Sequence, residues 1–110
     1  MQKALNMLGL CARAGKIVTG EKMTEKAVKN GSGLLVIMDG GISDTGRKSV
    51  TDACAYKKVA YFTVGKGALG SAIGKDNRMA LAVTDKGFAE RIAYLLREST
   101  SDTGVQENNG

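Results

Sequence analysis

Lysines at helical spacing are the residues of this chain with the clearest chemical potential. Lys22, Lys26 and Lys29 are separated by four and three positions, which places them on one face of a helix. Such a stripe repels itself in water, and only Glu21 and Glu25 offset it within the same segment. A phosphate backbone would relieve the repulsion, because each lysine that meets a phosphate releases a counterion. The stripe therefore favours a polyanionic partner, and the alternative is a face that serves solubility alone.

The overall charge is basic and unevenly distributed. The chain has 16 Lys and Arg against 11 Asp and Glu, a formal charge of +5. All of the bases but only eight of the acids precede residue 98, so residues 1–97 carry +8. A small body with that charge suits a nucleic acid.

Residue sets for catalysis and metal binding are poorly represented. Histidine is absent, which removes the commonest general base and metal ligand. Cys11 and Cys54 lie in apolar surroundings without Cys-x-x-Cys spacing, so we expect structural thiols, with a single disulfide as the alternative. The acids form no cluster typical of a magnesium site or an acid–base pair. We therefore expect no enzyme activity, no metal and no cofactor.

A glycine-rich segment carries a motif typical of nucleotide binding. Gly65-Lys66-Gly67-Ala68-Leu69-Gly70 follows an apolar run and opens a helical segment, where a turn could hold a diphosphate. That helix is short, the chain is too short for the paired halves of a dinucleotide fold, and Asp85 follows Gly70 by 15 positions where about 20 are expected. We interpret these glycines as allowing tight turns and close packing, with nucleotide binding as the weaker alternative.

Apolar runs and periodicity predict the elements that must position these residues. Unbroken apolar runs at 34–38, 59–64 and 79–83 predict strands covered on both faces, and Ile17–Thr19 predicts a short fourth strand. Helical apolar patterns lie before, between and after these runs. Because strand and helix alternate, we expect an α/β fold: a three-layer α/β/α sandwich with about four strands and about five helices.

The length of 110 residues is enough for a single domain. We place that domain at residues 1–97 and an acidic tail at 98–110, which we expect to be disordered because it lacks an apolar face. The N-terminal apolar stretch is interrupted by Asn6 and presents Leu10 before Cys11, which does not match a secretory leader. No apolar run reaches the roughly 18 residues of a membrane helix. We expect a cytoplasmic monomer without a membrane partner.

An ordered series of short motifs runs along most of the chain. It comprises Gly15-Lys16-Ile17-x-x-Gly20-Glu21-Lys22-x-x-x-Lys26-Ala27-Val28-x-x-Gly31, Leu34-Leu35-Val36-Ile37 with Asp39 behind it, Cys54-x-Tyr56, the run at 59–64, Leu69-Gly70-x-x-Ile73-Gly74, and Ala82-Val83-Thr84-Asp85-Lys86-Gly87-Phe88-Ala89. The series covers about residues 2–97. It resembles the kink-turn RNA-binding family of large-subunit ribosomal proteins, typified by archaeal ribosomal protein L-seven-Ae, and its last motif resembles the bacterial YlxQ-type branch.

The resemblance implies a binding site. Proteins of this family recognise the kink-turn, a sharply bent RNA whose tandem sheared G·A pairs lie beside a short bulge. It implies that residues 20–26 lie against the bend and that the loop at 75–78 covers the bulged nucleotides. Helix N-terminal amides attract phosphate, and lysine can donate to guanine O6. The expected RNA-binding residues are Lys16, Gly20, Glu21, Lys22, Met23, Lys26, Lys29, Asp39, Lys75, Asp76, Asn77 and Arg78.

Two parts of that site depart from the archaeal pattern. Lys22-Met23 stands where the archaeal proteins have Asn-Glu, and Glu21 stands where they have Thr. The loop at 75–78 is polar where the family is usually apolar, and Met79 alone adds an apolar surface. We expect a non-catalytic protein that binds structured RNA of kink-turn or similar bent geometry, in the ribosome or another ribonucleoprotein. The alternative is a protein-interaction or assembly module with a basic face.

Overall fold

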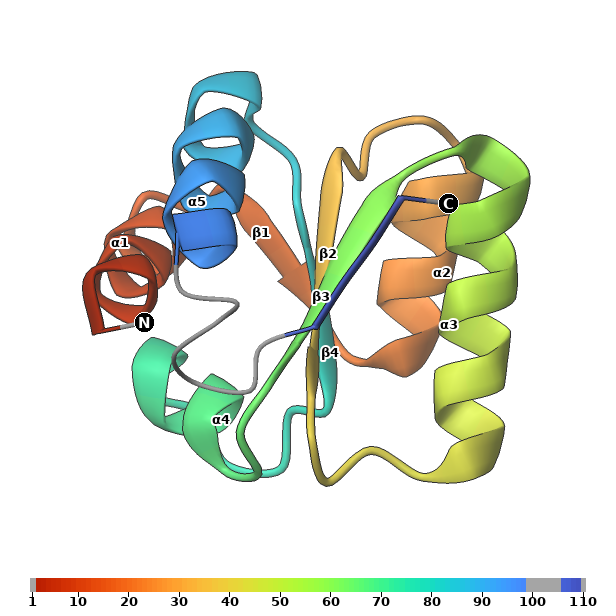
Figure 1. Ribbon diagram of the computed structural model, residues 1–110, viewed down its shortest axis with the longest axis horizontal. Helices are drawn as coiled ribbons and strands as arrows, with labels where there is room; N and C mark the ends of the chain where they lie inside the picture. The colour runs from red at the N-terminus through yellow and green to blue at the C-terminus, as the bar shows by residue number, and fades with distance from the viewer. Residues whose placement is uncertain (1, 99–105, 110) are drawn as a thin grey trace.

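The computed structural model describes residues 2–98 and 106–109 and has helices on both faces of a central sheet (Figure 1). The elements, in chain order, are α1 (Gln2–Arg13), β1 (Ile17–Thr19), α2 (Glu21–Lys29), β2 (Leu35–Asp39), α3 (Asp44–Lys57), β3 (Ala60–Val64), α4 (Ala68–Ile73), β4 (Ala80–Val83), α5 (Lys86–Glu98) and β5 (Gln106–Asn109). The five helices and the strands β1 to β4 confirm the expected α/β class.

The sheet is mixed, with the strand order β1-β4-β2-β3-β5. β2 and β3 are parallel, whereas β4 is antiparallel to both β1 and β2. The carboxyl ends of β2 and β3 therefore meet the amino end of β4 at one edge of the sheet, which is the lower edge in Figure 1. The start of α2 and the whole of α4 lie at this same edge.

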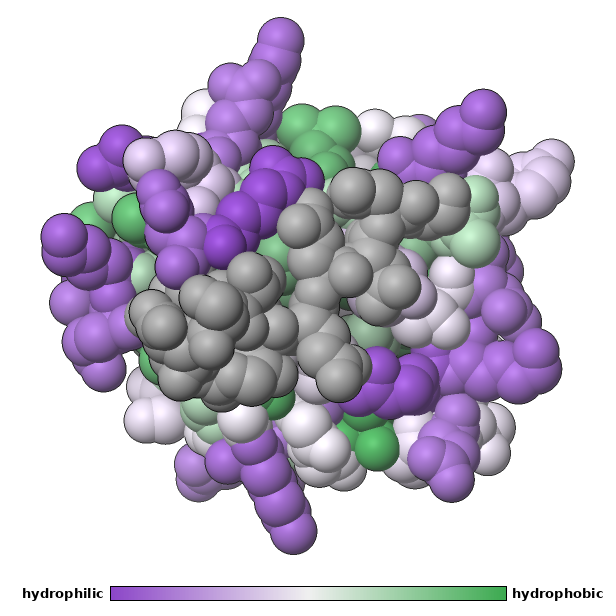
Figure 2. Space-filling view, viewed as in Figure 1, coloured by the Kyte–Doolittle hydropathy of each residue, from purple (hydrophilic) through white to green (hydrophobic). Residues whose placement is uncertain are grey.

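Alternation along the strands divides the core into two layers. Leu35 and Ile37 of β2 point toward α1, α4 and α5, whereas Val36 and Met38 point toward α2 and α3. These strand residues are buried on both faces, which explains why the runs in the sequence are unbroken. On the face shown in Figure 2, hydrophobic residues reach the surface only in small, separated patches, and hydrophilic side chains project around the rim.

Helix ends are defined by local backbone chemistry. Ser43 caps α3, since its Oγ accepts a hydrogen bond from the Gly46 amide at 3.1 Å. Gly15 has a positive φ of 72° where the chain turns from α1 into β1, a conformation that glycine adopts without the penalty of a Cβ. Lys58 ends α3 in the left-handed region, with a φ of 58°.

The chain after α5 departs from the expected tail at four positions. Gln106–Asn109 form β5, which pairs with the outer edge of β3. Sequence analysis placed no strand there, because backbone pairing at a sheet edge does not require the apolar pattern by which strands are recognised. The expected disorder otherwise falls on residues 99–105 and 110, which lie outside the described residues.

Within the described part of the chain, no helix has the length and apolar character needed to cross a membrane.

Candidate RNA-binding site

The start of α2 is the first component of the candidate site. Gly20 precedes the helix with φ 99° and ψ 150°, a region that side chains strongly disfavour, and has no side chain to cap the first turn. The first backbone amides of a helix lack intrahelical partners and attract anions. Met23, on this first turn, is 50% exposed, and Lys22 is also exposed. The expected reading residues thus lie on an accessible helix start.

Glu21 is the exception in this turn. Its carboxylate lies against α3, where a Cβ added at Gly46 would collide with it. The side chain is only partly exposed. Glu21 therefore contacts the neighbouring helix, which the glycine at position 46 makes possible.

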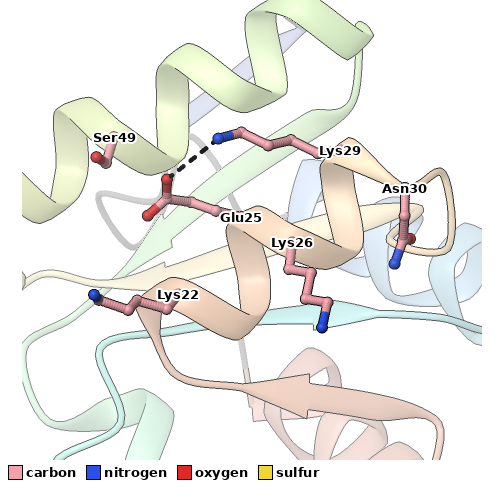
Figure 3. Close-up of a pocket in the computed structure, with 6 residues that line it drawn as sticks. All are labelled: Lys22, Glu25, Lys26, Lys29, Asn30 and Ser49. Atoms are coloured by element: carbon pink, nitrogen blue, oxygen red, sulfur yellow. Dashed lines mark ion pairs between the residues drawn. The ribbon is translucent and has the colours of Figure 1, made fainter.

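The predicted lysine stripe frames a hollow of about 650 Å³ on the outer surface of α2. Figure 3 shows that its ammonium groups diverge: Lys29 extends toward α3, whereas Lys26 points away from it. Glu25 lies 3.9 Å from Lys29, a surface ion pair of little energetic weight. Asn30 and Ser49 complete the lining. The divergence spreads positive charge over a broad surface, which suits a phosphate backbone more than a single anion.

Backbone hydrogen bonds bring the second predicted segment, the loop at 75–79, beside the start of α2. The Gly20 amide donates to the carbonyl of Ala80 at 2.8 Å. The Asp39 amide donates to the carbonyl of Met79, also at 2.8 Å. The end of β2, the start of β4 and the start of α2 therefore meet at one edge, and Gly20 and Ala80, 60 positions apart in sequence, become neighbours.

Asp39 organises this edge from beneath the surface. Its side chain is 1% exposed, and its oxygens accept hydrogen bonds from the amides of Gly41 at 2.9 Å, Gly67 at 3.0 Å and Leu69 at 3.2 Å. The last two amides belong to the start of α4, so Asp39 caps a helix whose own N-cap residue is a glycine. This geometry corrects the expectation of an RNA contact: Asp39 has almost no surface to offer and instead holds two loops in place.

The same hydrogen bonds bear on nucleotide binding, the alternative raised by the glycine-rich motif at 65–70. At the start of α4, the amides that could hold a diphosphate already bind the carboxylate of Asp39. Gly70 is needed for another reason, because a Cβ there would collide with the carbonyl oxygen of Lys75. The glycines thus serve turns and close packing, and the geometry disfavours nucleotide binding.

A second hollow, of about 550 Å³, lies between the loop at 65–67 and the loop at 75–79. Asp76, Asn77 and Arg78, three of the residues expected to bind RNA, line it, while Lys75 lies nearby in the chain. The Nε of Arg78 is buried and has no hydrogen-bond partner among the described residues. Lys66 also lines this hollow, although it was not among the residues expected from the sequence. Its position directly after a strand parallel to the one that ends at Asp39 was the signal that could have found it.

Lys16 is not brought to this edge. Its carbonyl accepts a hydrogen bond from the Thr84 amide, at the opposite end of β4 from Ala80. Four residues of extended chain separate it from Gly20, roughly 13 Å. Lys29 is also distant from the helix start, because α2 runs back across the sheet.

Cys11 and Cys54 are free, buried thiols on opposite sides of the sheet. Burial, with a smaller contribution from the charge of Asp85, raises the pKa of Cys11 to about 11. Burial raises the pKa of Cys54 to about 12. Both thiols are therefore packing groups. No group of three or more His, Cys, Asp or Glu side chains among the described residues could hold a metal ion.

Comparisons with known proteins agree with this fold. Residues 2–93 match the model of the ribosomal protein L7Ae/L30e/S12e/Gadd45 family. The chain is 43% identical over 91 residues to the RNA-binding protein YlxQ of Bacillus subtilis, covering 82% of this chain and 91% of the relative. It is 33% identical over 96 residues to the RNA-binding protein YlxQ of Enterococcus faecium, covering 86% of this chain and 92% of the relative.

Solved structures show the same architecture. A Bacillus halodurans protein of unknown function superimposes with a TM-score of 0.81 at 39% identity, covering 84% of this chain and 95% of the other. A Giardia lamblia 15.5kD RNA binding protein shares the fold, with a TM-score of 0.71 at 24% identity and coverage of 88% and 84%. The family match and the two bacterial relatives establish that this chain belongs to the ribosomal protein L7Ae/L30e/S12e/Gadd45 family.

Proposed function

We propose that this chain is a non-catalytic RNA-binding protein that recognises structured RNA of kink-turn or similar bent geometry. Membership of the L7Ae/L30e/S12e/Gadd45 family supports an RNA-binding role without catalysis, as do two relatives that are named RNA-binding proteins. The family also makes ribosomal RNA the first candidate partner and the cytoplasm the corresponding setting.

One observation carries the proposal: the uncapped start of α2 and the loop at 75–79 are fixed side by side by backbone hydrogen bonds. Gly20 and Asp39 donate to consecutive carbonyls, those of Ala80 and Met79, each at 2.8 Å. A bent RNA presents two surfaces at once, the distorted pairs of the bend and the nucleotides of the bulge. Two adjacent rigid protein segments match that demand better than a regular A-form helix, whose deep groove hides its base edges.

The chemistry divides among the exposed side chains. Lys22 lies on the first turn of α2, where its ammonium can donate to guanine O6 or to a phosphate. Met23 is half exposed beside it and offers an apolar contact to a base or ribose in place of a hydrogen bond. Arg78 and Lys66 add positive charge around the second hollow. The surface proposed to contact bases is therefore centred on Lys22. The basic residues around the loop at 75–79 are proposed to contact phosphates.

The test is RNA binding by a variant that carries both Lys22→Ala and Lys26→Ala. Fluorescence anisotropy with a labelled kink-turn RNA at fixed salt should show a loss of roughly 1–3 kcal/mol for each lysine that reads a base. A straight duplex of the same length separates recognition of the bend from general attraction to phosphate. Wild type should prefer the bent RNA, and the double variant should lose that preference.

The matched control removes the same charge from the other helical layer through Lys3→Ala and Lys86→Ala, on α1 and α5. This control should keep the preference for bent RNA and lose only a modest, salt-dependent part of the affinity. Equal losses in the two double variants would contradict a site on α2. Equal affinity of wild type for bent and straight RNA would contradict bent-RNA recognition itself.

A further inference from the structure

The carboxyl end of α3 carries an exposed aromatic side chain that the candidate site does not use. Tyr56 is 85% exposed, more than the other large hydrophobic or aromatic residues exposed in the described chain. A tyrosine in a folded protein ordinarily buries part of its ring, because the ring is a large apolar surface. An aromatic face so fully exposed is available to stack on a flat partner.

Two lysines follow this tyrosine in the sequence, and a hollow lies beside them. Lys57 and Lys58 follow it directly and are both exposed. They line a hollow of about 440 Å³ whose wall includes Val59 and Leu34, the latter 43% exposed. We call Leu34 and Tyr56–Lys58 the α3-end surface. It brings two lysines, an exposed aromatic ring and an exposed leucine to the end of α3.

The backbone of Lys58 gives an independent indication that this lysine has a role. Lys58 has φ 58° and ψ 43°, the left-handed conformation that commonly ends a helix and usually takes glycine. A lysine there is strained relative to glycine, because its Cβ approaches the following carbonyl. Favourable interaction with the helix dipole accounts for a basic residue near this end, which Lys57 already supplies. The helix dipole does not explain why a second lysine, Lys58, occupies a strained position, nor why the ring of Tyr56 is exposed.

Acidic side chains on α2 and α3 do little to neutralise this surface. Glu21 and Asp44 lie in the first turns, at the opposite end of each helix, and the other two are paired with other lysines. Asp52, one helical turn before Tyr56, lies 3.1 Å from Lys48. Glu25 lies 3.9 Å from Lys29. The α3-end surface thus keeps a net positive charge.

The α3-end surface lies away from the start of α2 and the loop at 75–79, although Val28 and Gly31, which flank Lys29 at the other end of α2, also line its hollow. α3 begins at Asp44, at the edge where β2 ends, and its 14 residues span roughly 20 Å to Lys57. In Figure 1 the start of α2 lies at the lower end of the molecule and the end of α3 at the upper end. A compact bend held at the lower edge would leave the α3-end surface open to a different part of the same RNA.

We propose that the α3-end surface is a second RNA-binding site, for an unpaired strand that flanks the bent element. Tyr56 stacks on a base, and Lys57 and Lys58 hold the adjacent phosphates. Stacking on an aromatic ring tolerates any base, and lysines contribute charge without sequence preference, so this site adds affinity without adding sequence specificity. The proposal rests on the proposed function, since it assigns a further segment to the same RNA.

The experiment compares a labelled kink-turn RNA with two longer RNAs that carry a tail of roughly twelve uridines at either the 5′ or the 3′ end. Tails of this length fall within the ~4–16 nucleotides that small single-strand-binding domains cover. Anisotropy at fixed salt should show about tenfold tighter binding by wild type for at least one tailed RNA. Tyr56→Ala should abolish that gain and leave affinity for the tailless RNA unchanged. Tyr56→Phe, which keeps the ring, should retain the gain.

A second variant addresses the lysines without disturbing the fold. Lys57→Ala combined with Lys58→Gly removes both charges and places glycine where the backbone favours it, so the melting temperature should not fall. The gain from the tail should shrink and lose its salt dependence. A gain that survives in both this variant and Tyr56→Ala, or wild type that gains nothing from either tail, would overturn the second site.

Failure of this proposal is distinguishable from failure of the proposed function. In the variant with Lys22→Ala and Lys26→Ala, free twelve-uridine RNA should still bind weakly and lose that binding on addition of Tyr56→Ala. If wild type fails to bind the tailless kink-turn RNA but this Tyr56-dependent binding persists, the proposed function fails and the second site stands. If the tailless RNA binds and the uridine probe does not respond to Tyr56, the reverse holds.

Discussion

Asp39 offers the sharpest test of how this protein holds its binding edge. Asp39→Asn keeps the shape of the side chain but replaces one acceptor oxygen with an NH₂ group and removes the charge. The remaining oxygen can accept from at most two of the three amides now bound, at 2.9, 3.0 and 3.2 Å. The NH₂ group must then face a backbone N–H, so a donor meets a donor in a buried place.

The size of the effect follows from these three bonds. A hydrogen bond to a charged acceptor contributes about 1.5–3 kcal/mol, and a hydrogen bond between neutral groups contributes about 0.5–1.5 kcal/mol. A buried amide left without a partner costs about 1–3 kcal/mol. Because such contributions do not add fully, we expect Asp39→Asn to lower the free energy of unfolding by about 3 kcal/mol. For a chain of this length, that corresponds to a fall of roughly 12 °C in melting temperature.

Urea unfolding measured by circular dichroism gives the free energy, and hydrogen exchange locates the damage. The Gly67 and Leu69 amides should lose protection before the amides of the central strand β2, because the start of α4 depends on this carboxylate. Affinity for bent RNA should fall as well, although Asp39 is buried, because the loops around it shift.

Ser43→Ala is the matched control. It removes one side-chain cap, the 3.1 Å bond to the Gly46 amide at the start of α3, and should cost about 1 kcal/mol. If Asp39→Asn cost no more than Ser43→Ala, or if the exchange of Gly67 and Leu69 were unchanged, the role assigned to Asp39 would be refuted.

Three further predictions follow from backbone geometry and burial. Gly20→Ala should lower the free energy of unfolding by about 2 kcal/mol and weaken binding of bent RNA, because φ 99° with ψ 150° is strained for any side chain. Urea unfolding measures the first effect and fluorescence anisotropy the second. Gly70→Ala should lower the melting temperature and displace the loop at 75–79, because the added Cβ would collide with the carbonyl oxygen of Lys75. Chemical-shift changes confined to that loop and its surroundings would show the displacement. Burial raises the pKa of Cys11 to about 11 and of Cys54 to about 12, so native protein at pH 8 should react slowly with iodoacetamide and unfolded protein quickly. The unfolded thiols ionise near pH 9 while the folded ones stay protonated, so the free energy of unfolding should fall as pH rises from about 9 toward 11 in urea titrations.

Controls for these predictions come from the same chain. Gly15→Ala also meets a positive φ, 72°, but lies away from the candidate site, so it should cost stability without a specific loss of RNA binding. Equal RNA-binding defects in the Gly15 and Gly20 variants would contradict the assignment of Gly20 to the site. Rapid alkylation of native protein would contradict buried thiols, and a Gly70→Ala variant with wild-type melting and spectra would contradict the close loop contact.

The sequence predicts the sheet well because its central strands are buried on both faces. Residues 34–38 form an unbroken apolar run, and β2 occupies Leu35–Asp39, one position further along. Gly15, which follows the first helix, has a positive φ, the conformation for which glycine is the usual residue after a helix. β5 could not be predicted, because its pairing with β3 depends on a free sheet edge and not on its own pattern.

The candidate site was predictable in part. The lysines of α2 were recognisable from helical spacing, but their divergence depends on how each side chain extends over the surface toward or away from α3. Lys16 was expected in the same site because it belongs to the same motif, although β1 separates it from the start of α2. Lys66 was overlooked because its glycine neighbours were interpreted as a tight turn with close packing and not as part of a binding surface. Residues close together in sequence can thus lie apart in the fold, as Lys16 does from the start of α2, and residues far apart in sequence can lie together, as Gly20 and Ala80 do.

The sequence alone determined the fold class, the basic character and the family resemblance, since each follows from local pattern: apolar runs, charge counts and ordered short motifs. Only the tertiary structure decided which of these residues lie together. Antiparallel pairing of β4 with β1 and β2 places Gly20, Asp39 and the loop at 75–79 at one edge, by hydrogen bonds between residues 40 and 60 positions apart. It also assigned Asp39 to the interior, because a carboxylate surrounded by three backbone amides is more stable bonded to them than exposed to a ligand.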